Sequence, residues 1–151
     1  MRAVLQRVES AQMTADGVKR GSIGKGLLVL LGVMKGDTEE DARRLSDKIA
    51  ALRIFSDEDG RMNRSLVDVG GSLMIASNFT LAANYRHGNR PDYFDGASPD
   101  EANRLYEHFV SLMRLKAPTE TGVFGADMQI NMVADGPVTI TMDSEVLKSK
   151  R

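Results

Sequence analysis

A short apolar run that ends abruptly in polar side chains constrains the fold of this chain more than any other feature. Residues 73–76 are apolar and include a β-branched side chain, which is typical of a strand buried on both faces of a sheet. Ser77, Asn78 and Thr80 then bring two hydroxyls and an amide to the end of that strand. A buried polar group without a partner costs about 1–3 kcal/mol. Either a neighbouring turn or a ligand must therefore satisfy these groups.

Composition places the chain among ordinary globular proteins. The chain has 151 residues, of which 42% are hydrophobic and 27% charged. This predicts one domain over residues 1–151 that is large enough to fold without disulfides. A net charge of −1 provides no overall field for binding nucleic acid, so such a ligand would need a local basic patch. With no cysteine and two histidines in unrelated contexts, the sequence predicts no disulfide, no metal site and no cofactor.

The amino-terminal segment has neither the apolar core nor the small-residue cleavage site of a secretory leader. No run of the sequence approaches the roughly 18 apolar residues of a membrane span. We therefore expect a cytoplasmic protein that has no membrane partner.

Hydrophobic periodicity predicts two helices and about seven strands. One helix should begin at Asp37 with Glu40 closing a capping box, and another at Ser98 with Glu101 in the same role. Residues 134–137 should form a turn that reverses the chain between two strands. The predicted class is α+β, with mostly antiparallel sheets forming a barrel-like or sandwich core and two main helices. Strands are expected at residues 2–8, 10–15, 18–23, 27–31, 73–76, 121–133 and 138–142.

The usual catalytic motifs are missing from this sequence. It has no Gly-x-Ser-x-Gly elbow and no metal-binding motif, and neither histidine has a triad partner in view. What remains is the polar strand end at residues 77–80, with its hydroxyls and backbone N–H groups. Such a site can polarise a carbonyl and stabilise an oxyanion, which suits a substrate-assisted reaction.

An irregular loop after this strand gathers positive charge. Arg86, His87 and Arg90 lie between Tyr85 and Tyr93. Cations interleaved with aromatic rings can hold a phosphate backbone and stack a base. A solvated surface loop explains the same residues equally well, so the residues alone leave both interpretations open.

Two motifs resemble the signatures of a known family. Ser77-Asn-Phe-Thr-Leu81 and Asp135-Gly-Pro-Val-Thr139 are similar to the two signature motifs of the D-aminoacyl-tRNA deacylases. The family usually has Gln at the position of Asn78 and Asn at the position of Ala134. Further similar segments occur in the same order, at residues 1–8, 26–30, 52–55 and 121–128.

The resemblance implies a homodimer that hydrolyses the ester of D-aminoacyl-tRNA, and of glycyl-tRNA mischarged on a non-cognate tRNA, without a cofactor. It implies that a Gly-cis-Pro turn of one subunit enters the site of the other and excludes L-amino acids. The catalytic roles would fall on Ser77, Phe79 and Thr80. Substrate contacts would come from Asn78, Phe124, Met128, Arg7, Gly136 and Pro137. The basic loop itself, rather than the resemblance, suggests tRNA contacts from Arg86, His87 and Arg90.

Two other classes remain open at the level of the sequence. The chain could be a nucleic-acid-binding module without catalysis that uses the basic loop and a basic tail formed by Lys148, Lys150 and Arg151. It could also be a structural dimer. The net charge of −1 weighs against the first of these.

Overall fold

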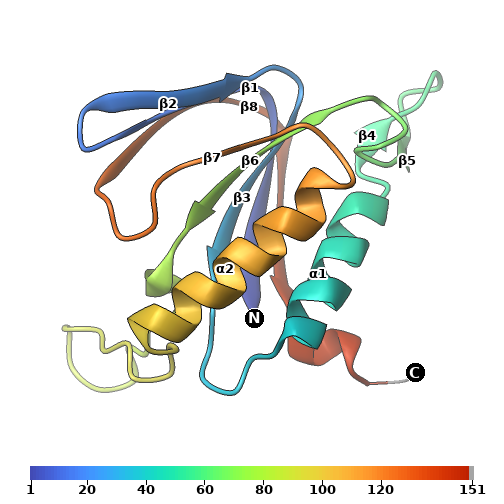
Figure 1. Cartoon of the computed structure of the whole chain (residues 1–151). Coiled ribbons are helices and arrows are strands. Elements are labelled where there is room, and N and C mark those ends of the chain that lie inside the picture. The colour runs from blue at the N-terminus through green and yellow to red at the C-terminus, as the bar shows by residue number, and fades with distance from the viewer. Residues whose placement is uncertain (150–151) are drawn as a thin grey trace.

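A curved sheet with two helices across one face forms the architecture of the protein in a computed structural model that describes residues 1–149 (Figure 1). In the described range, no helix is long and apolar enough to cross a membrane. The elements in chain order are β1 (Arg2–Ala15), β2 (Val18–Ile23), β3 (Gly26–Gly32), α1 (Glu39–Ala51), β4 (Phe55–Ser56), β5 (Met62–Arg64), β6 (Ser72–Ser77), η1 (Phe79–Ala82), α2 (Pro99–Arg114), β7 (Thr119–Thr121), β8 (Met128–Asp143) and η2 (Ser144–Leu147).

The long strand β1 organises the six-stranded sheet. It pairs antiparallel with β8 along almost its whole length, with β3 through its first half and with β2 through its second half. The β3–β6 and β6–β7 pairs are parallel. The predicted α+β class with mostly antiparallel pairing is therefore confirmed, although the two strands predicted at 2–8 and 10–15 form a single strand.

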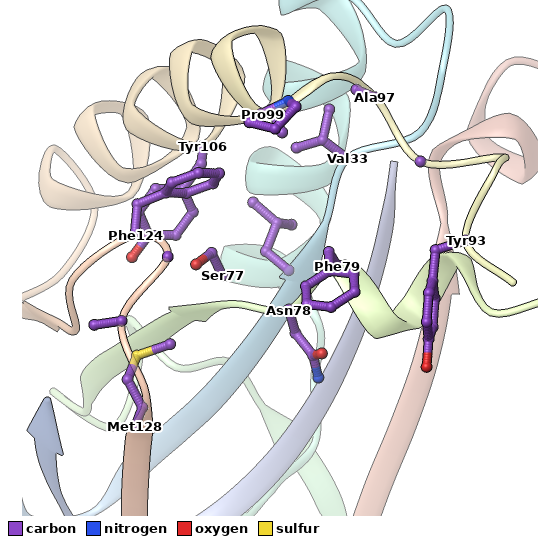
Figure 2. Close-up of a pocket in the computed structure, with 15 residues that line it drawn as sticks. Val33, Ser77, Asn78, Phe79, Tyr93, Ala97, Pro99, Tyr106, Phe124 and Met128 are labelled. Atoms are coloured by element: carbon purple, nitrogen blue, oxygen red, sulfur yellow. The ribbon is translucent and has the colours of Figure 1, made fainter. Parts of the chain in front are cut away.

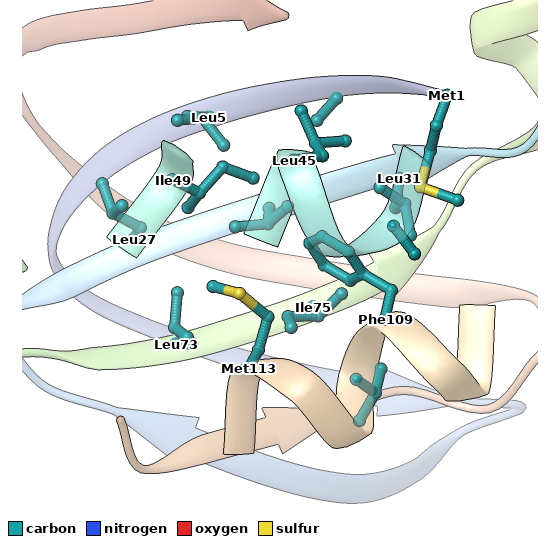
Figure 3. Packing of buried hydrophobic residues seen from close by; sticks show 14 of the residues in the cluster. Met1, Leu5, Leu27, Leu31, Leu45, Ile49, Leu73, Ile75, Phe109 and Met113 are labelled. Atoms are coloured by element: carbon teal, nitrogen blue, oxygen red, sulfur yellow. The ribbon is translucent and has the colours of Figure 1, made fainter. Parts of the chain in front are cut away.

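Apolar side chains fill both faces of the central strands. The larger core lies between the helices and the sheet and holds Leu73 and Ile75 of β6 (Figure 3). A second core covers the opposite face and holds Met74 and Ala76 of the same strand. Because successive side chains of a strand point to opposite faces, β6 is buried from solvent on both faces, as its uninterrupted apolar run predicts.

The start of α1 differs from the prediction. Its N-cap is Thr38, whose backbone N–H donates to Asp41 across 2.9 Å, so the capping box is shifted by one residue. Asp37 instead accepts from the Met1 ammonium at 2.6 Å and from the Met34 backbone N–H at 2.6 Å. The Asp37 carboxylate pairs with the ammonium instead of capping the helix, because a hydrogen bond between two charged groups is stronger than one to a neutral backbone N–H. At α2 the predicted Ser98 cap is confirmed by its contact with the N–H of Glu101.

The predicted reversal at residues 134–137 is wrong. Strand β8 runs through this segment, because both of its halves pair with the same long strand β1. The register passes from Gln6 opposite Thr139 to Val8 opposite Ala134, so β8 carries extra residues and bulges outward. Gly136 and Pro137 lie in this bulge, and the peptide bond between them is cis.

The strand predicted at residues 121–133 is interrupted. β7 ends at Thr121 and β8 begins at Met128, with a loop between them. Gly125 in this loop has a φ of +78°, a conformation that does not continue a strand. The Asp127 carbonyl accepts from the Asp16 N–H at 2.8 Å, which ties the loop to the β1–β2 turn.

A buried polar network joins the two ends of the described chain. The Met1 ammonium donates to Ser144 at 2.7 Å, and the Ser144 hydroxyl donates to Asp41 at 2.9 Å. Lys148 also reaches Asp41 at 2.9 Å. Burial by itself would raise the pKa of Asp41, but hydrogen bonds from Lys148, Thr38 and Ser144 outweigh burial and hold that pKa well below its usual range. Asp37, Asp41 and Glu145 lie close together, and cations already neutralise this acidic group.

Asp41→Asn should destabilise the fold by about 1–3 kcal/mol at pH 7, because it leaves buried donors poorly paired. The wild-type carboxylate has a folded pKa below its unfolded value near 3.9. The contribution of the Asp41 carboxylate to the free energy of unfolding is therefore present above about pH 4 and is lost as the pH falls through the folded pKa. Urea unfolding between pH 7 and pH 2 should show a smaller acid-induced loss in Asp41→Asn than in wild type. Asp59→Asn, in an exposed turn, is the control, and equal losses in Asp41→Asn and wild type would contradict the assignment.

Candidate active site

A cavity of about 420 Å³ opens where β6 ends (Figure 2). The end of β3 and the start of α2 form two of its walls, and the loop before β8 forms another. Five residues expected at the site line this cavity although they are far apart in the sequence: Ser77, Asn78, Phe79, Phe124 and Met128. The fold thus brings the polar strand end together with the segment at 124–128.

The start of η1 supplies hydrogen-bond donors beside the cavity. The Asn78 backbone N–H donates to the Leu31 carbonyl at 2.8 Å and is therefore occupied. The N–H groups of Phe79 and Thr80 come next, and among residues 1–149 no acceptor is found for either. A helix leaves its first N–H groups without intrahelical partners, so these two donors are available to a ligand.

Thr80 lies beside the cavity rather than in its wall. The side chain is exposed, and its hydroxyl donates to the Asn78 side-chain carbonyl at 2.5 Å. A hydroxyl has one proton, so the Thr80 oxygen offers its lone pairs to any further partner. Asn78 and Thr80 therefore form one hydrogen-bonded unit at the mouth of the site.

Aromatic side chains that the sequence did not assign to the site complete its walls. The ring of Tyr106 on α2 lies 6.0 Å from the Phe124 ring, measured between centroids, and the Tyr106 hydroxyl donates to the Ile75 carbonyl at 3.1 Å. Burial raises the pKa of Tyr106 to about 12, so its hydroxyl stays protonated. Tyr93 packs edge-on against Phe79 with 5.0 Å between ring centroids. A prediction that α2 crosses the end of β6 would have revealed Tyr106, whereas Tyr93 reaches the cavity from the loop that precedes α2.

Gly136, Pro137 and Arg7 do not reach the cavity of their own chain. Arg7 is buried, donates to the Ile54 carbonyl at 2.7 Å and pairs with Asp135 at 3.0 Å. These contacts hold the base of the β8 bulge, while Gly136 and Pro137 within the bulge are exposed. The turn at Gly136 and Pro137, which the resemblance assigns to excluding L-amino acids and which we call the gate, therefore faces outward and lies apart from the cavity.

The three predicted tRNA contacts, Arg86, His87 and Arg90, are exposed in the loop between η1 and α2. Within residues 1–149 none of them forms an ion pair. Lys148 of the basic tail is committed to Asp41 and Glu145, whereas Lys150 and Arg151 lie outside the described residues. Positive charge that is free to meet a ligand is therefore found in the loop.

Comparisons with known proteins show the family to which this chain belongs. Residues 4–143 match the model of the D-Tyr-tRNA(Tyr) deacylase family. The D-aminoacyl-tRNA deacylase of Anaeromyxobacter dehalogenans is 53% identical over 97% of this chain and 99% of its own. That of Geobacter sulfurreducens is 52% identical over 96% of each chain.

Solved structures share the fold. A protein described as "c-Myc DNA Unwinding Element Binding Protein" superposes with a TM-score of 0.89 at 35% identity, covering 95% of this chain and 98% of that one. A probable eukaryotic D-amino acid tRNA deacylase gives a TM-score of 0.81 at 17% identity, covering 93% and 97%. The sequence relatives are hydrolases. More particularly, the chain belongs to the D-Tyr-tRNA(Tyr) deacylase family and is a D-aminoacyl-tRNA deacylase, which confirms the resemblance seen in its motifs.

Asn78→Ala and Thr80→Ala should each lower kcat/KM for D-tyrosyl-tRNA by about tenfold or more, because each removes a polar group from the strand end where we expect the ester to bind. The double variant should be little worse than the worse single variant, since the two side chains act as one unit. Single-turnover hydrolysis with all four proteins measures the coupling. Asn103→Ala, exposed on α2, is the control, and fully additive losses would show that the hydrogen bond has no role.

Proposed function

We propose that this protein proofreads the chirality of aminoacyl-tRNA by hydrolysing the ester of D-amino acids and releasing free D-amino acid and tRNA in the cytoplasm. The observation that carries the proposal is the single cavity that joins Ser77, Asn78 and Phe79 to Phe124 and Met128. In this assignment Phe124 and Met128 contact the terminal adenosine, and the end of β6 receives the ester.

The chemistry must be assisted by the substrate. No acidic or basic side chain lines the cavity within the described residues, so the site lacks an obvious protein base. We assign the N–H groups of Phe79 and Thr80 to the oxyanion that forms when the ester carbonyl is attacked. The 2′-hydroxyl of the terminal ribose, next to the ester, then assists the attacking water, and the tRNA 3′-oxygen leaves.

The gate is best supplied by a second copy of the chain. Gly136 and Pro137 face solvent at the tip of the bulge and are absent from the cavity wall of their own chain. Phe79, at the cavity mouth, is 68% exposed, as expected of a side chain that another subunit covers. In the proposed homodimer the bulge of one subunit closes the site of the other and leaves no room for an L side chain. Glycyl-tRNA would also be accepted, because glycine has no side chain to exclude.

Gly136→Ala should reduce D-tyrosyl-tRNA hydrolysis at least about tenfold and lower the ratio of D to L rates. Gly136 has a φ of +123°, and a Cβ there would approach the Val138 nitrogen to 2.8 Å, so the bulge must move. Hydrolysis of matched D- and L-tyrosyl-tRNA tests this. Gly60→Ala is the matched control, because Gly60 has a φ of +75° with open space around it. An unchanged D-to-L ratio in a folded Gly136→Ala protein would refute the gate.

Replacing Arg86 and Arg90 together by Ala should weaken tRNA binding and leave the cleavage rate at saturating tRNA nearly unchanged. Loss of two phosphate contacts should reduce the slope of log K against log salt by about 1.4–1.8. Binding titrations between 50 and 200 mM salt measure the slope. The control replaces Lys19 and Arg20, two exposed cations on β2. If the Arg86/Arg90 variant keeps the wild-type slope, the loop does not contact phosphates.

A second candidate is nucleic-acid binding without catalysis. The basic loop and the similarity to a protein described as binding a DNA unwinding element favour it. The two functions separate in one assay, because a binding module would retain tRNA or duplex DNA on a filter without releasing D-tyrosine from D-tyrosyl-tRNA.

A further inference from the structure

Tyr85 is an exposed aromatic residue that the fold does not require. Its side chain is 79% exposed and belongs to neither hydrophobic core. It lies in the loop between η1 and α2, which extends beyond the first turn of α2 at the lower left of Figure 1. An exposed tyrosine that packs against nothing is a candidate contact for a ligand.

The loop has a defined geometry at Tyr85. The Asn84 N–H donates to the Asp92 carbonyl at 2.8 Å, and the Asp92 N–H donates back at 3.0 Å, which closes the loop with an antiparallel bridge. Tyr85 directly follows Asn84 and Tyr93 directly follows Asp92, so the bridge holds the backbone of Tyr85 near that of Tyr93. Tyr93 lines the cavity and packs against Phe79 (Figure 2). The bridge therefore places Tyr85 close to the part of the loop that borders the cavity.

From this arrangement we propose that Tyr85 is a stacking subsite for the unpaired nucleotide that precedes the terminal adenosine of the RNA. The proposal rests on the proposed function, which places that adenosine in the cavity. Charge selects the occupant: Arg86 and Arg90 are exposed and unpaired within residues 1–149, in the segment between Tyr85 and Asp92. Two free cations so close to Tyr85 in the sequence favour a polyanion that carries exposed bases. Rings beside cations bind single-stranded nucleic acid by base stacking.

The test compares two probes, adenosine and the single-stranded RNA trinucleotide CpCpA, by calorimetric titration of the intact protein. Wild type should bind CpCpA more tightly than adenosine. Tyr85→Ala should weaken CpCpA binding about 5- to 100-fold, the effect of losing one base–aromatic stack, and leave adenosine binding unchanged. Tyr85→Phe should keep the CpCpA affinity because the ring remains. Leu115→Ala, which truncates another exposed apolar side chain (85% exposed) on the carboxyl end of α2, is the control.

The possible results separate this inference from the proposed function. If adenosine binds but CpCpA binds no tighter in wild type, the subsite is refuted and the cavity assignment stands. If neither probe binds, both assignments fail. Equal weakening of both probes by Tyr85→Ala would show that the residue supports the cavity rather than forming a subsite. Loss of dimerisation in Tyr85→Ala with unchanged RNA binding would assign this side chain to a second copy of the chain and overturn the proposal.

Discussion

Burial of β6 on both faces is the constraint on which the site depends. Leu73 and Ile75 pack under the helices, while Met74 and Ala76 pack against the opposite core, so the strand can end only where a polar environment begins. That boundary falls at Ser77, where η1 turns away and exposes the N–H groups of its first turn. The polar part of the cavity wall is therefore a consequence of where the buried strand β6 ends.

Strand β1 imposes the second constraint. Because β8 pairs with β1 on both sides of the bulge, the extra residues of β8 cannot be absorbed by a shift of register and must project outward. Arg7 on β1 holds the base of this projection through Ile54 and Asp135. The cavity and the bulge that carries Gly136 and Pro137 therefore lie in different places on the chain, and it is this separation that the proposed homodimer would bridge.

Local patterns in the sequence predicted the elements whose environment is uniform. The apolar run at 73–76, the Ser98 cap and the α+β class were all correct, because each depends on neighbouring residues or on simple periodicity. The errors at Asp37 and at residues 134–137 have another origin. Asp37 is occupied by an ammonium that is distant in sequence, and the bulge exists only because both halves of β8 share one partner strand. Tyr93 and Tyr106 were missed for the same reason, since they become cavity walls through tertiary packing.

The two departures from the family motifs differ in their structural consequences. Ala134 is exposed and keeps its pairing with Val8 through backbone groups, so the strand does not depend on its side chain. Asn78 is different, because its side-chain carbonyl accepts a hydrogen bond from the Thr80 hydroxyl two residues along. In the Gln that the family usually has here, the amide lies one methylene farther from the backbone, so the same hydrogen bond would need another side-chain conformation. The direction of the Thr80 hydroxyl proton is therefore tied to the side chain at position 78.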